Sequence, residues 1–231
     1  MTRKIILDLC GGSGSWSKPY KEAGYDVRLI TLPDYNVEHV VFSDDYMVFD
    51  KQTYSVNDMA VRYKDVYGIL AAPPCTEYSV LNRDKYNNRE LFLDFDKYKN
   101  TVNTDVLNAC LKIIEKCEPV FYAIENPCGL MRKYMGKPQL SFQPYQYGDG
   151  WTKKTDIWGK FNIPKTTHTW ETCPKLNLYT RPNRERPSIA FLHKSAISLI
   201  PQFAGIEVNT DAALRAITPP GFAKAFFEAN P

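Results

Sequence analysis

The chain has 231 residues, of which 44% are hydrophobic, 13% aromatic and 24% charged, and its formal charge is +3. This composition predicts a folded protein of one domain with at most a small appendage, and excludes a membrane protein because no apolar run approaches ~20 residues. The six cysteines form no CxxC pair and no secretory signal precedes the first apolar run, so we expect a cytoplasmic protein with free thiols.

The charge is unevenly distributed along the chain. Up to Glu125 there are 15 Lys and Arg against 19 Asp and Glu, whereas residues 126–231 hold 14 against 7. The more basic second half can face a polyanion such as a nucleic acid, although lysines scattered on solvated faces would give the same sum.

The first apolar run, residues 4–9, ends in a glycine-rich turn and is followed by a helical pattern that closes at Gly24. Strand, glycine turn and helix in this order favour a nucleoside-type cofactor, because glycines let the backbone come close to a ligand. Ser17 replaces the third glycine of the dinucleotide pattern, so an NAD site is disfavoured, and Ser15 is a candidate helix cap. The turn comprises Leu9, Cys10, Gly11, Gly12, Ser13 and Gly14.

Residues 26–32 predict a second strand, which runs into Pro33, Asp34 and Tyr35. An acidic side chain at this edge can accept hydrogen bonds from a ribose or an adenine amine, and Asp34 is the candidate. An aspartate that only makes an Asx turn would look the same in the sequence. Two β-type runs then flank a polar turn over residues 40–49, which predicts a hairpin without chemistry of its own.

Residues 68–79 form an apolar run that stops at Pro73 and Pro74 and then presents Cys75. The run predicts a buried strand of a parallel sheet, with Cys75 at the carboxyl edge where open α/β sheets bind ligands. The paired prolines stiffen the turn, which suits a nucleophile, while an ordinary half-buried thiol is the alternative. The polar residues 82–89 can form a loop that closes over a substrate.

The next two segments of the sequence are expected to form a helix that covers the sheet and a second strand with a functional residue at its end. Apolar side chains at helical spacing over residues 106–117 place Cys110 and Cys117 in the core. Residues 120–127 repeat the design of the Cys75 strand, so Glu125 is expected at the same sheet edge. A carboxyl group there is expensive to ionise unless it is paired, which favours a general acid over a residue that only satisfies turn amides.

The last third combines aromatic and basic residues. Residues 143–159 bring aromatic rings together with Lys153 and Lys154, a combination that suits a nucleotide. Residues 164–201 are rich in proline and polar residues without clear periodicity. His168 and Cys173 lack two further ligands at suitable spacing, so no metal is expected. Prolines from position 219 open a final helical stretch.

Together these stretches resemble the DNA (cytosine-5) methyltransferase family in its compact, phage-like form. Residues 7–14 resemble the family's S-adenosylmethionine (SAM) motif, residues 73–79 its nucleophile motif and residues 125–127 its ENV motif, in the family's order. Residues 146–154 resemble the later motif that carries arginines, and residues 221–227 stand where the last motif returns to the cofactor. Proline replaces the valine of ENV, and lysines stand where arginines are usual.

The resemblance implies an α/β protein with a Rossmann-like SAM-dependent methyltransferase fold, built on a doubly wound, mostly parallel sheet. It implies a catalytic domain over residues 1–160, a reduced target-recognition region over residues 161–212 and a C-terminal helix region over residues 213–231. The cofactor would be SAM, held by the glycine turn with Asp34, Tyr35 and Pro73.

By the same resemblance, the Cys75 thiolate adds to C6 of cytosine, Glu125 assists at N3, and Lys153 and Lys154 take the place of the arginines. The partner would be DNA with the target cytosine flipped out, and the small recognition region leaves room for a specificity partner protein. Two alternatives stay open: an RNA cytosine-C5 methyltransferase, and a catalytically lapsed nucleic-acid-binding module. The coexistence of Cys75 and Glu125 disfavours the lapsed module.

Overall fold

The computed structural model describes residues 4–79, 95–99 and 102–231. Its centre is a six-stranded sheet with strand order β2-β1-β6-β7-β9-β8. Strands β2, β1, β6 and β7 run parallel, while β9 is antiparallel to β7 and β8 to β9. The predicted mostly parallel α/β sheet is thus confirmed. The strands are β1 (Ile5–Leu9), β2 (Asp26–Ile30), β6 (Val66–Ala71), β7 (Phe121–Pro127), β8 (Leu140–Phe142) and β9 (Thr155–Lys160).

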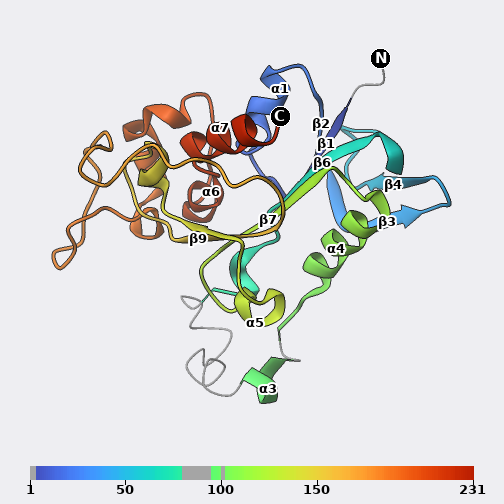
Figure 1. Cartoon of the computed structure of the whole chain (residues 1–231), viewed down its shortest axis with the longest axis horizontal. Helices are drawn as coiled ribbons and strands as arrows, with labels where there is room; N and C mark the ends of the chain where they lie inside the picture. The colour runs from blue at the N-terminus through green and yellow to red at the C-terminus, as the bar shows by residue number, and fades with distance from the viewer. Residues whose placement is uncertain (1–3, 80–94, 100–101) are drawn as a thin grey trace.

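Helices cover both faces of this sheet (Figure 1). Helices α1 (Lys18–Glu22) and α7 (Pro220–Ala229) lie on one face and α4 (Asp105–Cys117) on the other. Side chains of β1 alternate between the two layers, as the period of a strand requires. Leu7 and Leu9 join the core cluster that includes α4, and Ile6 joins the aromatic cluster of α1 and α7. The sheet is therefore doubly wound.

A second, three-stranded antiparallel sheet is inserted between β2 and β6. It comprises β3 (Tyr35–Phe42), β4 (Tyr46–Lys51) and β5 (Met59–Arg62). Val41 pairs with Val48, so the predicted hairpin is confirmed. The buried side chains of this sheet belong to the same cluster as α4. Cys110 and Cys117 of α4 are buried there, as expected.

The C-terminal part has a small core of its own. Short helices carry it: α6 (Asp211–Ala216) and the 3-10 helices η5 (Ile189–Phe191), η6 (Lys194–Leu199) and η7 (Pro201–Phe203). Their apolar side chains pack around Trp151, together with Ile217. This cluster reaches beyond both ends of residues 161–212, and the three-part division of the chain stays a prediction. The other elements are η1 (Tyr63–Asp65), η2 (Cys75–Glu77), α3 (Phe95–Tyr98), α5 (Met131–Met135) and η4 (Pro144–Tyr147).

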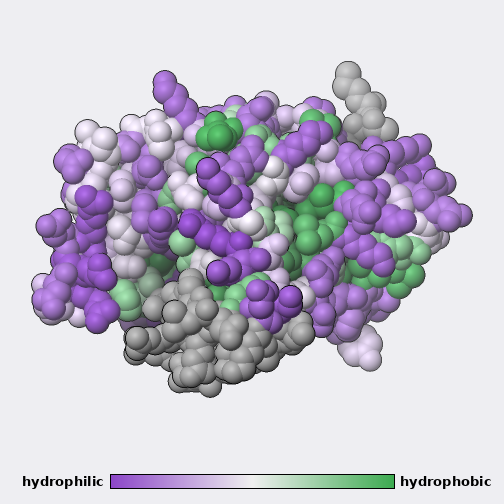
Figure 2. Space-filling view, turned by 60° about the horizontal axis from the view of Figure 1, so that its bottom comes forward, coloured by the Kyte–Doolittle hydropathy of each residue, from purple (hydrophilic) through white to green (hydrophobic). Residues whose placement is uncertain are grey.

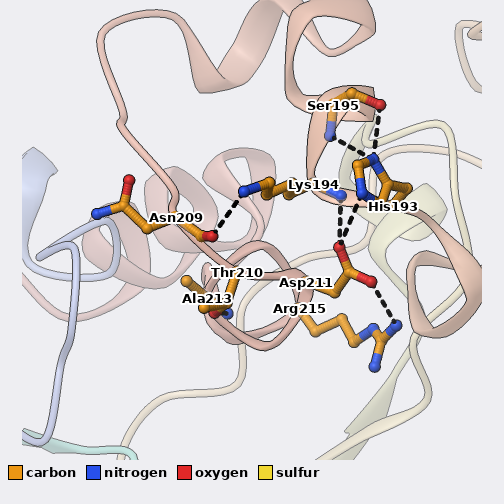
Figure 3. Close-up of polar contacts among 8 residues, drawn as sticks. All are labelled: His193, Lys194, Ser195, Asn209, Thr210, Asp211, Ala213 and Arg215. Atoms are coloured by element: carbon orange, nitrogen blue, oxygen red, sulfur yellow. Dashed lines mark hydrogen bonds and ion pairs between the residues drawn. The ribbon is translucent and has the colours of Figure 1, made fainter.

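Polar contacts hold η6 against α6 (Figure 3). The Lys194 ammonium donates to the carbonyl of Asn209, and the backbone N–H of Lys194 donates to Asp211. Arg215 pairs with Asp211 at 3.7 Å, one turn along α6. In the described part of the chain, no helix is long and apolar enough to cross a membrane.

Candidate active site at the carboxyl edge of the sheet

Strands β1, β2 and β6 end at one level, and β7 continues beyond it to Pro127. Leu9 of β1 pairs with Ile30 on one side and with Ala71 on the other, and Ala71 pairs with Ile124. The chain runs from β1 outward to β2 and from β6 outward to β7, so the strand order reverses between β1 and β6. Ligands of open α/β sheets bind in the crevice at such a reversal. The glycine turn follows β1 and the Cys75 turn follows β6, so the fold brings both to this crevice.

The glycine turn adopts a backbone that most residues avoid. Gly12 and Gly14 have φ angles of +55° and +68°, where a side chain is strained, and Cys10 accepts φ +59° despite its side chain. The N–H of Gly14 donates to the carbonyl of Gly11 and closes the turn. Gly12 and Ser13 are exposed, so their backbone can meet a ligand.

Asp8 lies directly beneath this turn, and the sequence analysis did not select it. Its side chain is fully buried in β1, and the Ser17 hydroxyl donates to its carboxylate. Burial raises the Asp8 pKa to about 6, against the hydrogen bonds from Ser17. Among the described residues its Oδ1 has no partner, and a Cβ added at Gly11 would collide with this carboxyl group. A single acidic residue within an apolar strand was the signal that could have identified it.

The other predicted cofactor residues are held by contacts within the protein. The Asp34 carboxylate accepts hydrogen bonds from the hydroxyls of Thr53 (2.8 Å) and Ser55 (3.1 Å). The Tyr35 ring is buried in the core, and its hydroxyl donates to the carbonyl of Asn57. A cofactor contact by either residue stays a prediction. The Leu9 side chain is likewise buried, and its carbonyl accepts the N–H of Ala72.

The segment after the glycine turn is tied to the start of α7. Ser15 does not cap α1, contrary to the prediction, because that helix begins at Lys18 and the Ser15 hydroxyl donates to the carbonyl of Thr218 at 2.7 Å. Buried Asp149 accepts the N–H of Gly221 at 3.0 Å. Burial raises the Asp149 pKa to about 7, opposed by the backbone hydrogen bonds at this helix start. The start of the C-terminal helix therefore lies against the segment that follows the glycine turn.

The Cys75 turn is anchored from the neighbouring strand. Buried Asn126 of β7 donates from Nδ2 to the carbonyl of Pro73 at 2.9 Å. Cys75 itself is exposed and opens the 3-10 helix η2. Asn126 thus fixes the position of the thiol relative to Glu125, its neighbour in the chain. The predicted closing loop over residues 82–89 lies outside the described residues.

Glu125 and Lys153 form an ion pair beside Cys75. The Lys153 Nζ lies 3.5 Å from the Glu125 Oε1, and both side chains are 11% exposed. A buried carboxylate is expensive to ionise unless it has a partner of opposite charge, and Lys153 is that partner for Glu125. Protein atoms crowd the Cys75 thiol and raise its pKa by desolvation, the Lys153 ammonium lowers it and the Glu125 carboxylate raises it. Three of the four predicted catalytic groups, Cys75, Glu125 and Lys153, are thus within electrostatic reach of one another, whereas exposed Lys154 is not among the groups that act on Cys75.

One contact of Lys153 itself and one of the strand that follows it fix the position of Lys153. The Lys153 N–H donates to the Gln143 side chain at 3.0 Å. Strand β9, which begins two residues later, is clamped by Arg132 of α5, whose guanidinium binds Asp156 with two hydrogen bonds of 2.6 and 2.7 Å. Sequence analysis missed Gln143, Arg132 and Asp156 as positioning residues, because their partners are distant in the chain.

Lys153 also lines a basic cleft of about 600 Å³ that leads away from this pair. The cleft lies against the C-terminal part, whose surface is predominantly hydrophilic, on the left of Figure 2. Lys194 is engaged with Asn209 and does not line the cleft. Among the described residues, no group of three His, Cys, Asp or Glu is placed to hold a metal ion. The cationic residues of the cleft are Lys153, Lys154, Arg181, Arg184 and Arg186.

Comparison with known proteins finds similarity to methyltransferases. No protein-family model matches the chain. Over 137 residues the chain is 28% identical to the type II methyltransferase M.DdeI of Desulfomicrobium norvegicum, which covers 54% of this chain and 28% of that protein. A solved structure described as a DNA modification methyltransferase encoded within an E. coli prophage is 16% identical, with a TM-score of 0.39, covering 84% of this chain and 54% of that chain. The chain therefore spans only part of the proteins that it resembles.

Proposed function

We propose that this chain is a SAM-dependent methyltransferase that acts on C5 of cytosine in DNA. The observation that carries the proposal is the convergence of Cys75, Glu125 and Lys153 beside a glycine turn, at the reversal point of a parallel sheet. Sequence similarity to a type II methyltransferase supports the reaction class. The basic cleft supports a polyanionic substrate.

The residues at the edge of β1 fit SAM. The exposed backbone of Gly12 and Ser13 can approach a nucleoside, and glycine at position 11 leaves room for the buried Asp8 carboxyl group beneath the turn. The unpartnered Oδ1 of Asp8 can accept a hydrogen bond from the amino-acid part of the cofactor. SAM supplies an electrophilic methyl group.

The protein residues would prepare the base for this group. The Cys75 thiolate adds to C6 of cytosine, which breaks the C5–C6 double bond and makes C5 nucleophilic. Negative charge that develops at N3 is met by the Glu125–Lys153 pair, which can hold a proton or a positive charge there. After methylation of C5, a base takes the C5 proton, the electron pair of that C–H bond restores the C5–C6 double bond, and Cys75 leaves as the thiolate.

Incubation of the protein with SAM carrying a tritiated methyl group tests the reaction. DNA, RNA and free dCMP are offered separately, and the labelled base is identified after hydrolysis. We expect the label in 5-methylcytosine from DNA. Label in RNA alone would favour the RNA alternative, and label in none of them would favour a binding module.

The rate should increase with pH, because transfer needs the Cys75 thiolate and burial raises the pKa of this thiol. Lys153→Gln removes the cation that lowers the Cys75 pKa, so its rate profile should rise at higher pH than that of the wild type. Lys154→Gln is the matched control, because the exposed Lys154 does not contribute to the Cys75 pKa. Single-turnover rates between pH 6 and 10 measure the shift. An unshifted profile in Lys153→Gln would contradict this role of Lys153.

Target recognition should be relaxed and sensitive to salt. Arginine and lysine side chains of the cleft suit phosphates, and phosphate contacts carry no sequence information. We expect methylation at a short or degenerate target and DNA affinity that falls steeply as salt rises. Bisulfite sequencing of plasmid DNA from a host that expresses the protein checks this. Methylation confined to one long, strictly defined site would show that residues 161–212 read bases directly.

A further inference from the structure

The basic cleft carries two exposed aromatic rings that the proposed chemistry does not use. Tyr179 is 61% exposed and Phe191 is 42% exposed, and both line the cleft. Large apolar side chains on a hydrated surface favour a binding site when they stand next to polar recognition groups. In this cleft their neighbours are five cationic side chains and one carboxylate, Glu185.

The cations beside these rings have charge available for a ligand. Among the described residues Lys154, Arg181 and Arg184 form no ion pair. The Arg181 guanidinium lies over one face of the Phe191 ring, 4.5 Å from its centroid, so a base can stack on the guanidinium or on the other face of the ring. Aromatic faces and guanidinium planes next to free positive charge form the usual surface for unpaired bases and their phosphates.

The same part of the protein lacks an element of the kind that reads a duplex. The major groove admits an α-helix or a two-stranded β-ribbon. Residues 161–217 are all described, and they contain no strand and no helix longer than six residues. Leu214 of α6 is buried in the small core, and α6 is held to η6 by the contacts of Asp211. This segment therefore has no long helix or two-stranded ribbon that could enter the major groove and read base pairs.

We propose that the cleft binds an unpaired DNA strand, with bases stacked on Tyr179 and Phe191 and phosphates contacted by the surrounding arginines. This inference rests on the proposed function and specifies its substrate: cytosine in single-stranded or locally opened DNA. Lys153 lines the cleft and also pairs with Glu125, so a DNA strand bound in the cleft lies next to the proposed catalytic residues. Because every base has an aromatic face, stacking also accounts for a relaxed target sequence.

Fluorescence anisotropy with labelled oligonucleotides tests this without any methyl transfer. The probes are a single strand of DNA made only of A and T that is not self-complementary, its duplex and an RNA of the same sequence, at two salt concentrations. The variants Tyr179→Leu and Phe191→Leu keep apolar bulk and remove the ring. Tyr54→Leu is the matched control, because Tyr54 is fully exposed in the segment between β4 and β5, outside the cleft. Circular dichroism confirms that each variant is folded.

We expect the single DNA strand to bind at least about tenfold more tightly than the duplex, and each ring substitution to weaken it by roughly 5- to 100-fold. Tyr54→Leu should bind like the wild type. Equal or tighter duplex binding, or unchanged affinity in both ring variants, would overturn the proposal. Tighter binding of the RNA would overturn the choice of DNA. Since the probes contain no cytosine, a failure of the methylation chemistry would leave these results unaffected.

Discussion

The Cys75→Ser variant should lose methyl transfer to cytosine down to background while it binds SAM nearly as well as the wild type. A serine hydroxyl is close to the thiol in size, but it ionises far less readily. The glycine turn that would hold the cofactor belongs to a different strand and is left intact. Tritium transfer measures the first effect, and calorimetric titration with SAM measures the second.

A substrate with 5-fluorocytosine provides a direct test of the covalent step. Fluorine at C5 cannot leave as the proton does, so the wild-type protein should stay bound to the base through the Cys75 sulfur. The control is Cys128→Ser, which alters a partly buried cysteine near Asp156 and should still be trapped. An adduct that survives in Cys75→Ser, or one that is lost only in Cys128→Ser, would mean that Cys75 is not the nucleophile.

The second large effect is expected at Glu125. Glu125→Gln keeps the shape of the side chain but cannot hold a transferable proton, and it leaves the Lys153 ammonium without its partner. We expect turnover to fall by about 10²-fold or more, with a much smaller change in DNA affinity. Single-turnover kinetics at saturating DNA and anisotropy measurements separate the two quantities.

Glu115→Gln is the matched control for this substitution. Glu115 is exposed on α4 and does not line the cleft, so the same change there should leave turnover within about twofold of the wild type. Thermal unfolding of both variants shows whether a slower reaction only reflects a loss of structure. A Glu125→Gln variant with unchanged turnover would reduce Glu125 to a residue that stabilises its strand.

The sequence alone determined most of the secondary structure around the site. Apolar runs that end in glycine or proline identified β1 and β6, and helical periodicity identified α4, because these signals depend on neighbours only a few residues apart. The shared edge of Glu125 and Cys75 also followed from the sequence. Strands of a parallel sheet present their carboxyl ends on the same side, so similar endings of two strands predict proximity.

Only the tertiary structure decided which side chains contact one another at that edge. Lys153 pairs with Glu125 across 28 positions of sequence, and Asn126 bonds to Pro73 across 53. Such contacts depend on strand order and on which turns the fold places together, and neither leaves a local pattern. Ser15 shows the same limit: it had the chemistry of a helix cap, but the return of the C-terminal segment offered its hydroxyl the carbonyl of Thr218.

For the basic residues in the second half of the chain, the sequence showed their number and the fold decided which of them can bind a ligand. Their number and their lack of helical spacing were evident from the sequence, and they predicted contact with a polyanion. The fold separated Lys194, which is bonded to Asn209, from Arg181 and Arg184, which line the cleft and form no ion pair with any described residue. A cationic side chain binds whichever oxygen the folded chain brings within reach, so charge is encoded locally, whereas the availability of that charge is set by packing.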